Sequence, residues 1–148
     1  MTALEDLLAA HDTAIFERLR AHTYLKPVVF DGKVPNLPGG RPRNSYVNVH
    51  TSGRPFVRER RDARQMQVAR TYTVHSVSVD PDEARALQGA VVAQLLNFRP
   101  DIPGRSAFRL SYESSLAIRP DESTDPWLWY TVDQFDLNTT PAKEAPHG

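Results

Sequence analysis

The stretch "TYTVHSVSVDPDEARALQGAVVAQL", Thr71 to Leu95, decides the fold. Its first nine residues are rich in β-branched side chains, which predicts a strand. Asp80 follows as a helix N-cap, and Pro81 takes the first helical position, where its missing N–H costs nothing. We expect Glu83 to complete the cap. A strand that runs directly into a capped helix indicates a helix packed against a sheet.

The helix predicted over residues 81–98 has one apolar stripe. The stripe repeats at helical spacing, as on a helix with one buried face. Its members are Ala84, Leu87, Val91 and Leu95. Gly89 lies in the middle of the helix and weakens it by about 1 kcal/mol relative to alanine.

The strand predicted over residues 66–79 changes its apolar side midway. Met66, Val68, Tyr72 and Val74 share one parity, whereas Ala69, Val77 and Val79 have the other. Side chains alternate between the two faces of a strand. We therefore expect either a β-bulge or a strand that is covered on both faces near its end.

The elements that precede this strand are a helix and two strands. The helix is predicted from Thr2 to His22, with a capping box formed by Thr2 and Glu5. Its apolar stripe consists of Leu4, Leu8, Ile15 and Leu19. A short strand follows at residues 28–30. A second strand at residues 45–50 should place Tyr46, Asn48 and His50 on one face and bury Val47 and Val49 on the other.

Two further strands, at residues 106–120 and 127–137, flank the acidic loop "DESTDP" and form a hairpin. The predicted order is α-β-β-β-α-β-β. This order describes an α+β fold in which an antiparallel or mixed sheet packs against two helices. Residues 1–140 should form one domain, and residues 141–148, which lack an apolar pattern, a flexible tail.

The composition restricts the function. The chain has no cysteine, which removes disulfides, thiolate catalysis and cysteine-ligated zinc. No apolar run is long enough to span a membrane. The formal net charge is zero, yet residues 1–70 carry +5 and residues 71–148 carry −5. The uneven charge is either chance or the mark of a protein whose basic face meets the acidic face of another copy.

The stretch "GRPFVRERRDARQMQV", Gly53 to Val68, concentrates arginine without lysine. Guanidinium groups make forked contacts with carboxylates and phosphates. We expect this loop to contact another protein subunit or the phosphates of a nucleic acid, the alternative being a solvated loop. Its arginines are Arg54, Arg58, Arg60, Arg61 and Arg64.

The aromatic residues concentrate at Trp127, Trp129 and Tyr130. Both faces of this strand are apolar, because Leu128 and Val132 share the face of Tyr130. These aromatics therefore either cover the second helix or form an interface with a partner.

We predict no catalytic, cofactor or metal site. No nucleophile–base pattern or phosphate-binding loop is present. His50 and His75 could meet across strands, and we expect a packing pair rather than a metal site. Asp121, Glu122 and Asp125 lack the ligand spacing of a calcium loop.

The whole layout resembles the tail terminator proteins of long-tailed bacteriophages, especially actinobacterial ones. The resemblance depends on "VVFDGKVPN", on "SYVNVH", on the strand–helix stretch above and on "GRSAFRLSYESSLAIRPDESTDPWLWYTVDQFDL". The family often has Pro-Tyr before the second strand, where this chain has Ser45-Tyr46. The resemblance covers most of the chain except its tail.

The resemblance implies a structural virion protein that forms a hexameric ring on the completed tail tube. It also implies docking to the head-completion proteins of the neck, DNA that passes through the lumen without sequence recognition, and assembly in the host cytoplasm. A neck connector protein is the nearest alternative. A nucleic-acid-binding module that uses the arginine loop is less favoured, since such domains are usually basic. An enzyme is the third alternative.

Overall fold

The computed structural model describes residues 3–53, 55–56 and 67–142. In chain order the elements are α1 (Ala3–Arg20), β1 (Val29–Asp31), β2 (Ser45–Ser52), β3 (Pro55–Phe56), β4 (Gln67–Ser78), α2 (Pro81–Leu95), β5 (Arg105–Ala107), β6 (Ser111–Asp121) and β7 (Leu128–Pro141). The predicted α+β fold is confirmed, with β3 as a short strand that the prediction lacked.

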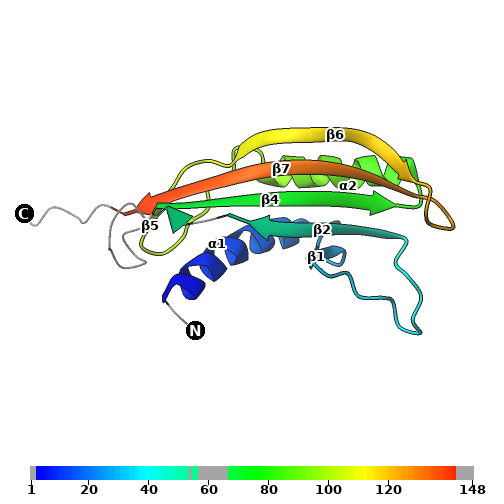
Figure 1. Ribbon diagram of the computed structural model, residues 1–148, viewed down its shortest axis with the longest axis horizontal. Helices are drawn as coiled ribbons and strands as arrows, with labels where there is room; N and C mark the ends of the chain where they lie inside the picture. The colour runs from blue at the N-terminus through cyan, green and yellow to red at the C-terminus, as the bar shows by residue number, and fades with distance from the viewer. Residues whose placement is uncertain (1–2, 54, 57–66, 143–148) are drawn as a thin grey trace, which may run out of the picture.

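One mixed sheet contains all of these strands (Figure 1). Its order is β1-β2-β4-β7-β5, with β3 paired to β4 and β6 paired to β7. Only the β1–β2 pair is parallel among the described strands. Both helices lie on the same side of the sheet (Figure 1), which leaves the other face without a helix.

The core lies between the two helices and this face of the sheet. The predicted stripe of α2, namely Ala84, Leu87, Val91 and Leu95, is buried. It packs against Val47 and Val49 of β2, which are also fully buried as predicted. Of the stripe predicted for α1, Ile15 and Leu19 are fully buried, whereas Leu8 is half-buried.

Both helices are shorter than the predicted 2–22 and 81–98. Asn97 ends the turn after α2 with φ 60°, in the left-handed region that stops helices. Asp80 caps α2 as predicted, with its carboxylate accepting from the N–H of Asp82 at 3.0 Å.

The expected completion of the cap by Glu83 is wrong. The hydroxyl of Ser78 accepts the N–H of Asp80 at 3.1 Å, and the Glu83 carboxylate instead accepts the hydroxyl of Tyr24 at 2.5 Å. Burial and the neighbouring Glu83 raise the pKa of Tyr24 to about 12.

The last three residues of β4 are covered on both faces of the sheet. Ser76, Val77 and Ser78 are consecutive and all buried. The ladders from β4 to β2 and to β7 run without a register shift. Of the two explanations for the change of apolar side, a bulge is therefore wrong and coverage on both faces is correct.

The strand predicted over residues 106–120 is broken. β5 ends at Ala107, opposite Thr139, and β6 resumes at Ser111, opposite Asp136. Between them, Leu110 leaves the sheet and is buried in the core, with its N–H donating to the carbonyl of Phe98 at 2.8 Å. Burying this leucine interrupts the ladder.

A buried histidine joins α1 to the far end of β7. The Nδ1–H of His11 donates to the Leu7 carbonyl at 2.7 Å, so Nε2 is the acceptor for the Thr139 hydroxyl at 2.7 Å. The same hydroxyl accepts from Nε of Arg105 at 3.1 Å. Burial, above all, lowers the pKa of His11, which favours the neutral imidazole whose Nε2 accepts from Thr139.

Asp12, the next residue of α1, holds a second polar cluster. Its carboxylate accepts from Arg70 Nη2 at 2.6 Å, from Arg70 Nε at 3.2 Å and from the hydroxyl of Tyr72 at 2.9 Å. The Tyr72 side chain is fully buried. α1 is therefore fixed to β4 by charge and hydrogen bonds as well as by apolar packing.

β6 is an edge strand that pairs only with β7. Most of its residues are exposed, including Leu116 at 45%. Its ladder has register shifts between Tyr112 and Ser114 and between Leu116 and Arg119. The Tyr112 hydroxyl donates to the buried carboxylate of Asp133, which ties this part of β6 to β7.

β7 continues to Pro141, and the N–H of Ala142 donates to the Gly104 carbonyl at 3.1 Å. Residues 143–148 of the predicted tail lie outside the described residues. No helix in the described ranges combines the length and the apolar character needed to cross a membrane.

Candidate interaction surface

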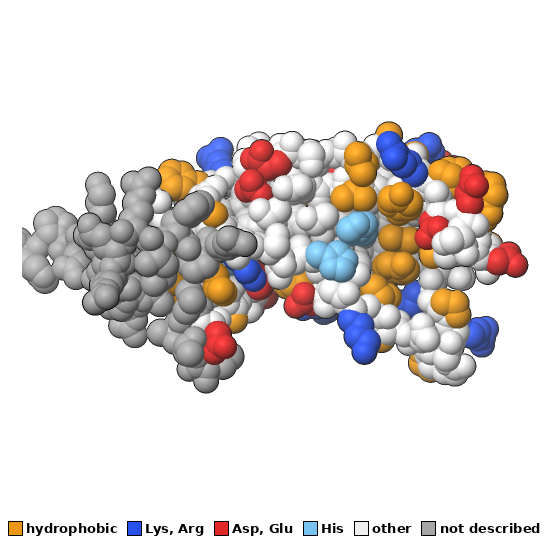
Figure 2. All heavy atoms as spheres, in the orientation of Figure 1, with side chains coloured by type: hydrophobic (Ala, Val, Ile, Leu, Met, Phe, Trp, Pro, Cys, Tyr) orange, Lys and Arg blue, Asp and Glu red, His pale blue; other side chains and the backbone are white. Residues whose placement is uncertain are grey.

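The helix-free face of the sheet has two adjacent rows of side chains that run across four strands. Cross-strand register aligns Tyr46 of β2, Val77 of β4, Tyr130 of β7 and Arg119 of β6 in the first row. The second row aligns Asn48, His75, Val132 and Leu116. Figure 2 shows the histidines in pale blue beside the hydrophobic side chains in orange.

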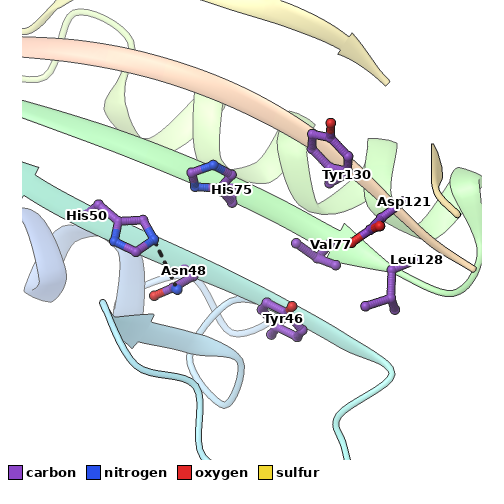
Figure 3. Close-up of a pocket in the computed structure, with 8 residues that line it drawn as sticks. All are labelled: Tyr46, Asn48, His50, His75, Val77, Asp121, Leu128 and Tyr130. Carbon is purple, nitrogen blue, oxygen red and sulfur yellow. Dashed lines mark hydrogen bonds between the residues drawn. The ribbon is translucent and has the colours of Figure 1, made fainter. Parts of the chain in front are cut away.

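A shallow pocket of about 310 Å³ opens on these rows. Its walls are Tyr46, Asn48, His50, His75, Val77, Asp121, Leu128 and Tyr130 (Figure 3). Four strands contribute these residues, with the apolar ones gathered toward the β6–β7 hairpin. The pocket is therefore a shallow hollow of mixed apolar and polar lining on a sheet surface, the type of feature that accepts a side chain of a partner.

Two polar atoms near this pocket are buried without a hydrogen-bond partner. They are Oδ1 of Asn48 and Nδ1 of His75. The amide nitrogen of Asn48 donates to the Gly32 carbonyl and to Nε2 of His50, each at 3.3 Å. Buried polar groups are normally paired, so these two atoms are exceptions within this part of the sheet.

His50 and His75 meet as predicted, in an edge-to-face pair with ring centroids 5.3 Å apart. Burial, and then the neighbouring His50, lowers the pKa of His75. Among the residues that the structure describes, no group of three or more His, Cys, Asp or Glu could hold a metal ion. The two rings contact each other between β2 and β4.

The three aromatics predicted either to cover the second helix or to form an interface separate in the structure. Trp129 is half-buried and lies opposite Ser78, on the face that the helices cover. Tyr130 lines the pocket. Trp127 precedes β7 and is 49% exposed.

Of the predicted arginines, Arg54, Arg58, Arg60, Arg61 and Arg64 all lie outside the described residues. The ends of their segment are described, since β3 pairs antiparallel with the start of β4. Gly53, just before, has φ 133°, and a Cβ there would be 2.3 Å from the carbonyl oxygen of Ala69. Only glycine allows this close approach of two backbones.

The loop between β1 and β2, residues 32–44, carries Lys33, Arg41 and Arg43 and no acidic residue. It is internally ordered, because the N–H of Leu37 donates to the Arg41 carbonyl at 2.8 Å. Nε of Arg43 donates to the Pro35 carbonyl at 2.8 Å, and its guanidinium lies over the Phe30 ring.

The β6–β7 loop, taken here as residues 121–127 so that it includes the last residue of β6, carries Asp121, Glu122 and Asp125 and no basic residue. The carboxylate of Asp121 accepts from the hydroxyl of Ser123 at 2.6 Å and from its N–H at 3.1 Å. These bonds lower the pKa of Asp121. The hydroxyl of Thr124 closes the loop by accepting the N–H of Leu128 at 3.0 Å.

Sequence reasoning did not assign the pocket residues Tyr46, Val77 and Leu128 to an interaction surface. The change of apolar side within the stretch 66–79 was the available signal, since it placed Val77 on the face opposite the core. The neighbours of Val77 in the row, Tyr46 and Tyr130, are 31 and 53 residues away in the sequence, and only the pairing of their strands with β4 brings them together.

A comparison of the sequence with models of known protein families finds no match, and a comparison with curated proteins finds none either. The fold is similar to that of a protein chain in the virion of a native gene transfer agent particle. That chain is 18% identical, with a TM-score of 0.65, over 90% of this chain and 97% of the other. A second solved structure is 15% identical, with a TM-score of 0.62, over 95% and 98%. At these identities the similarity shows a shared fold.

Proposed function

We propose that this protein is a structural component of a phage-like virion and, within it, the tail terminator. In this role a ring of six copies caps the completed tail tube and joins it to the head-completion proteins. The observation that supports the proposal most strongly is the similarity to a chain of the gene transfer agent virion. It extends over 90% of this chain and 97% of the other.

The surface chemistry favours a structural rather than a catalytic role. The helix-free face has an apolar row, a shallow pocket and two buried polar atoms without partners. β6 adds a long exposed edge. Surfaces of this type are buried when subunits assemble, because a contact removes apolar area from water.

Electron microscopy tests the assignment. The gene is deleted, and particles are compared with those made when the protein is resupplied. Loss of a tail terminator should give tubes of uncontrolled length and heads without tails, while resupply restores particles of uniform length. Immunogold labelling should place the protein where the tail meets the head. Normal tails without the protein, or a label at the distal tip, would contradict the proposal.

The arginine segment supplies a second test within the same function. We propose that it is an assembly loop, in which desolvated forked bonds contribute roughly 1.5–3 kcal/mol each. Changing Arg58, Arg60 and Arg61 together to alanine should then give folded protein but unattached heads and tails. Normal particles with altered DNA ejection would instead assign the segment to the lumen. Normal particles with normal DNA delivery would leave it a solvated loop.

A further inference from the structure

We propose that the acidic β6–β7 loop of one copy binds the basic β1–β2 loop of the next copy, so that subunits join head to tail. Residues 121–127 of one subunit would contact residues 32–44 of its neighbour. The binding partner of each loop is thus a second copy of this chain. The proposal names the contact that would build the ring proposed above, yet its test does not depend on that ring.

Charge complementarity is the first argument. The two loops carry formal charges of −3 and +3, with no opposite charge inside either. Within the described residues, Glu122, Asp125, Lys33 and Arg41 form no ion pair in their own subunit. All four are exposed, so their charges are available to a neighbour. Opposite patches of this kind guide association and exclude wrong pairings.

Shape and order give the second argument. Each loop is held by hydrogen bonds of its own, so little conformational entropy is lost on contact. Each also presents one large apolar side chain, namely Trp127 at 49% exposure and Leu37 at 37%. Exposed tryptophan within a charged rim is typical of the centre of a protein interface.

The position of the loops favours a head-to-tail arrangement. β2 begins at Ser45, opposite Ser78, and Ser78 lies opposite Trp129 near the start of β7. The loops therefore project from the same end of the sheet but at opposite edges (Figure 1). Three strand spacings separate β2 from β6, or about 14 Å. A neighbour placed beside the exposed edge of β6 meets the acidic loop and leaves the basic loop free for the next copy.

Cross-linking tests the contact directly, because the chain has no cysteine. Asn36→Cys and Ser123→Cys place one thiol in each exposed loop. A bis-maleimide is added to each variant alone, to their mixture and to the double variant, both as purified protein and in assembled particles. We expect dimers from the mixture, a ladder of oligomers from the double variant, and no cross-linked dimer from either variant alone.

Charge reversal is the matched control. Lys33→Glu with Arg41→Glu, or Glu122→Lys with Asp125→Lys, should lower cross-linking in the mixture about tenfold, since each exchanges attraction for repulsion. Mixing the variant with the reversed basic loop and the variant with the reversed acidic loop should restore the cross-linking. Circular dichroism confirms that each variant is folded.

The outcomes separate this inference from the proposed function. Dimers from single-cysteine variants, a product that stops at dimer, or cross-linking insensitive to charge reversal would overturn the head-to-tail loop contact, even if the protein caps tails. Absence of cross-links in both preparations would overturn it as well. A charge-dependent ladder from a protein that has no role in tails would support the contact and refute the function.

Discussion

Replacing Asp12 by alanine should lower the free energy of unfolding by about 2–3 kcal/mol. The change leaves the Tyr72 hydroxyl buried without an acceptor, which costs about 1–3 kcal/mol. It also leaves Arg70 without its carboxylate. The two side chains of this ion pair are 22% and 11% exposed, so solvent screens part of the charge term and the full cost of about 3–5 kcal/mol for a buried pair is not reached. A gain in helix propensity of up to about 0.7 kcal/mol opposes the loss.

Urea unfolding, followed by circular dichroism and extrapolated linearly to water, measures the difference. Glu17→Ala is the control, because Glu17 lies exposed on the same helix and its replacement has only the propensity effect. Tyr72→Phe should cost about 1 kcal/mol, since Asp12 keeps both bonds to Arg70. If Asp12→Ala and Glu17→Ala agree within about 0.5 kcal/mol, the usual scatter of surface changes, the cluster does not stabilise the fold.

Three further predictions follow from other contacts. Because burial lowers the pKa of His11 below 6.5, its stabilising contribution is complete above pH 6.5 and is lost as the pH falls through the lowered pKa; between pH 8 and pH 5 the wild type should therefore lose more stability than His11→Gln, and equal losses in chemical denaturation would contradict this. Gly89→Ala should stabilise α2 by about 1 kcal/mol, since the new Cβ meets nothing within 4 Å, whereas Gly53→Ala should destabilise the protein through its clash with β4; thermal melts showing the same sign for both would be inconsistent with the structure. Deleting residues 143–148 should leave the melting temperature unchanged, while a deletion that begins at 141 should lower it by removing a pair of the β5–β7 ladder.

Features with strong local patterns could be predicted from the sequence. The stripe and cap of α2, the burial of Val47 and Val49 and the hairpin at the end of the chain all follow from periodicity and turn residues within short windows. The double coverage of β4 was visible as a change of parity around Val77. In each case the residues that decide the outcome are neighbours in the sequence.

Features that depend on distant partners could not be predicted. From the sequence His11 is a polar residue on a helix. It is buried in the structure, where the hydroxyl of Thr139, 128 residues away, bonds its Nε2 and accepts from Arg105. The break before Ser111 follows from the space that the core offers to Leu110, which no local pattern reveals. For the aromatics at the start of β7 the sequence left two alternatives open, helix cover and interface, and strand register places Trp129 on the face that the helices cover.

The irregular ladder of β6 has a consequence for the protein before assembly. A long open strand edge invites pairing with any other edge, and repeated pairing leads to fibres. Here two register shifts, the charges of Glu113 and Arg119 and the ring of Pro120 interrupt the edge. No straight run of free N–H and C=O groups extends over the whole strand. Copies of the protein can thus accumulate without templating one another through this edge, and any association is left to side-chain complementarity.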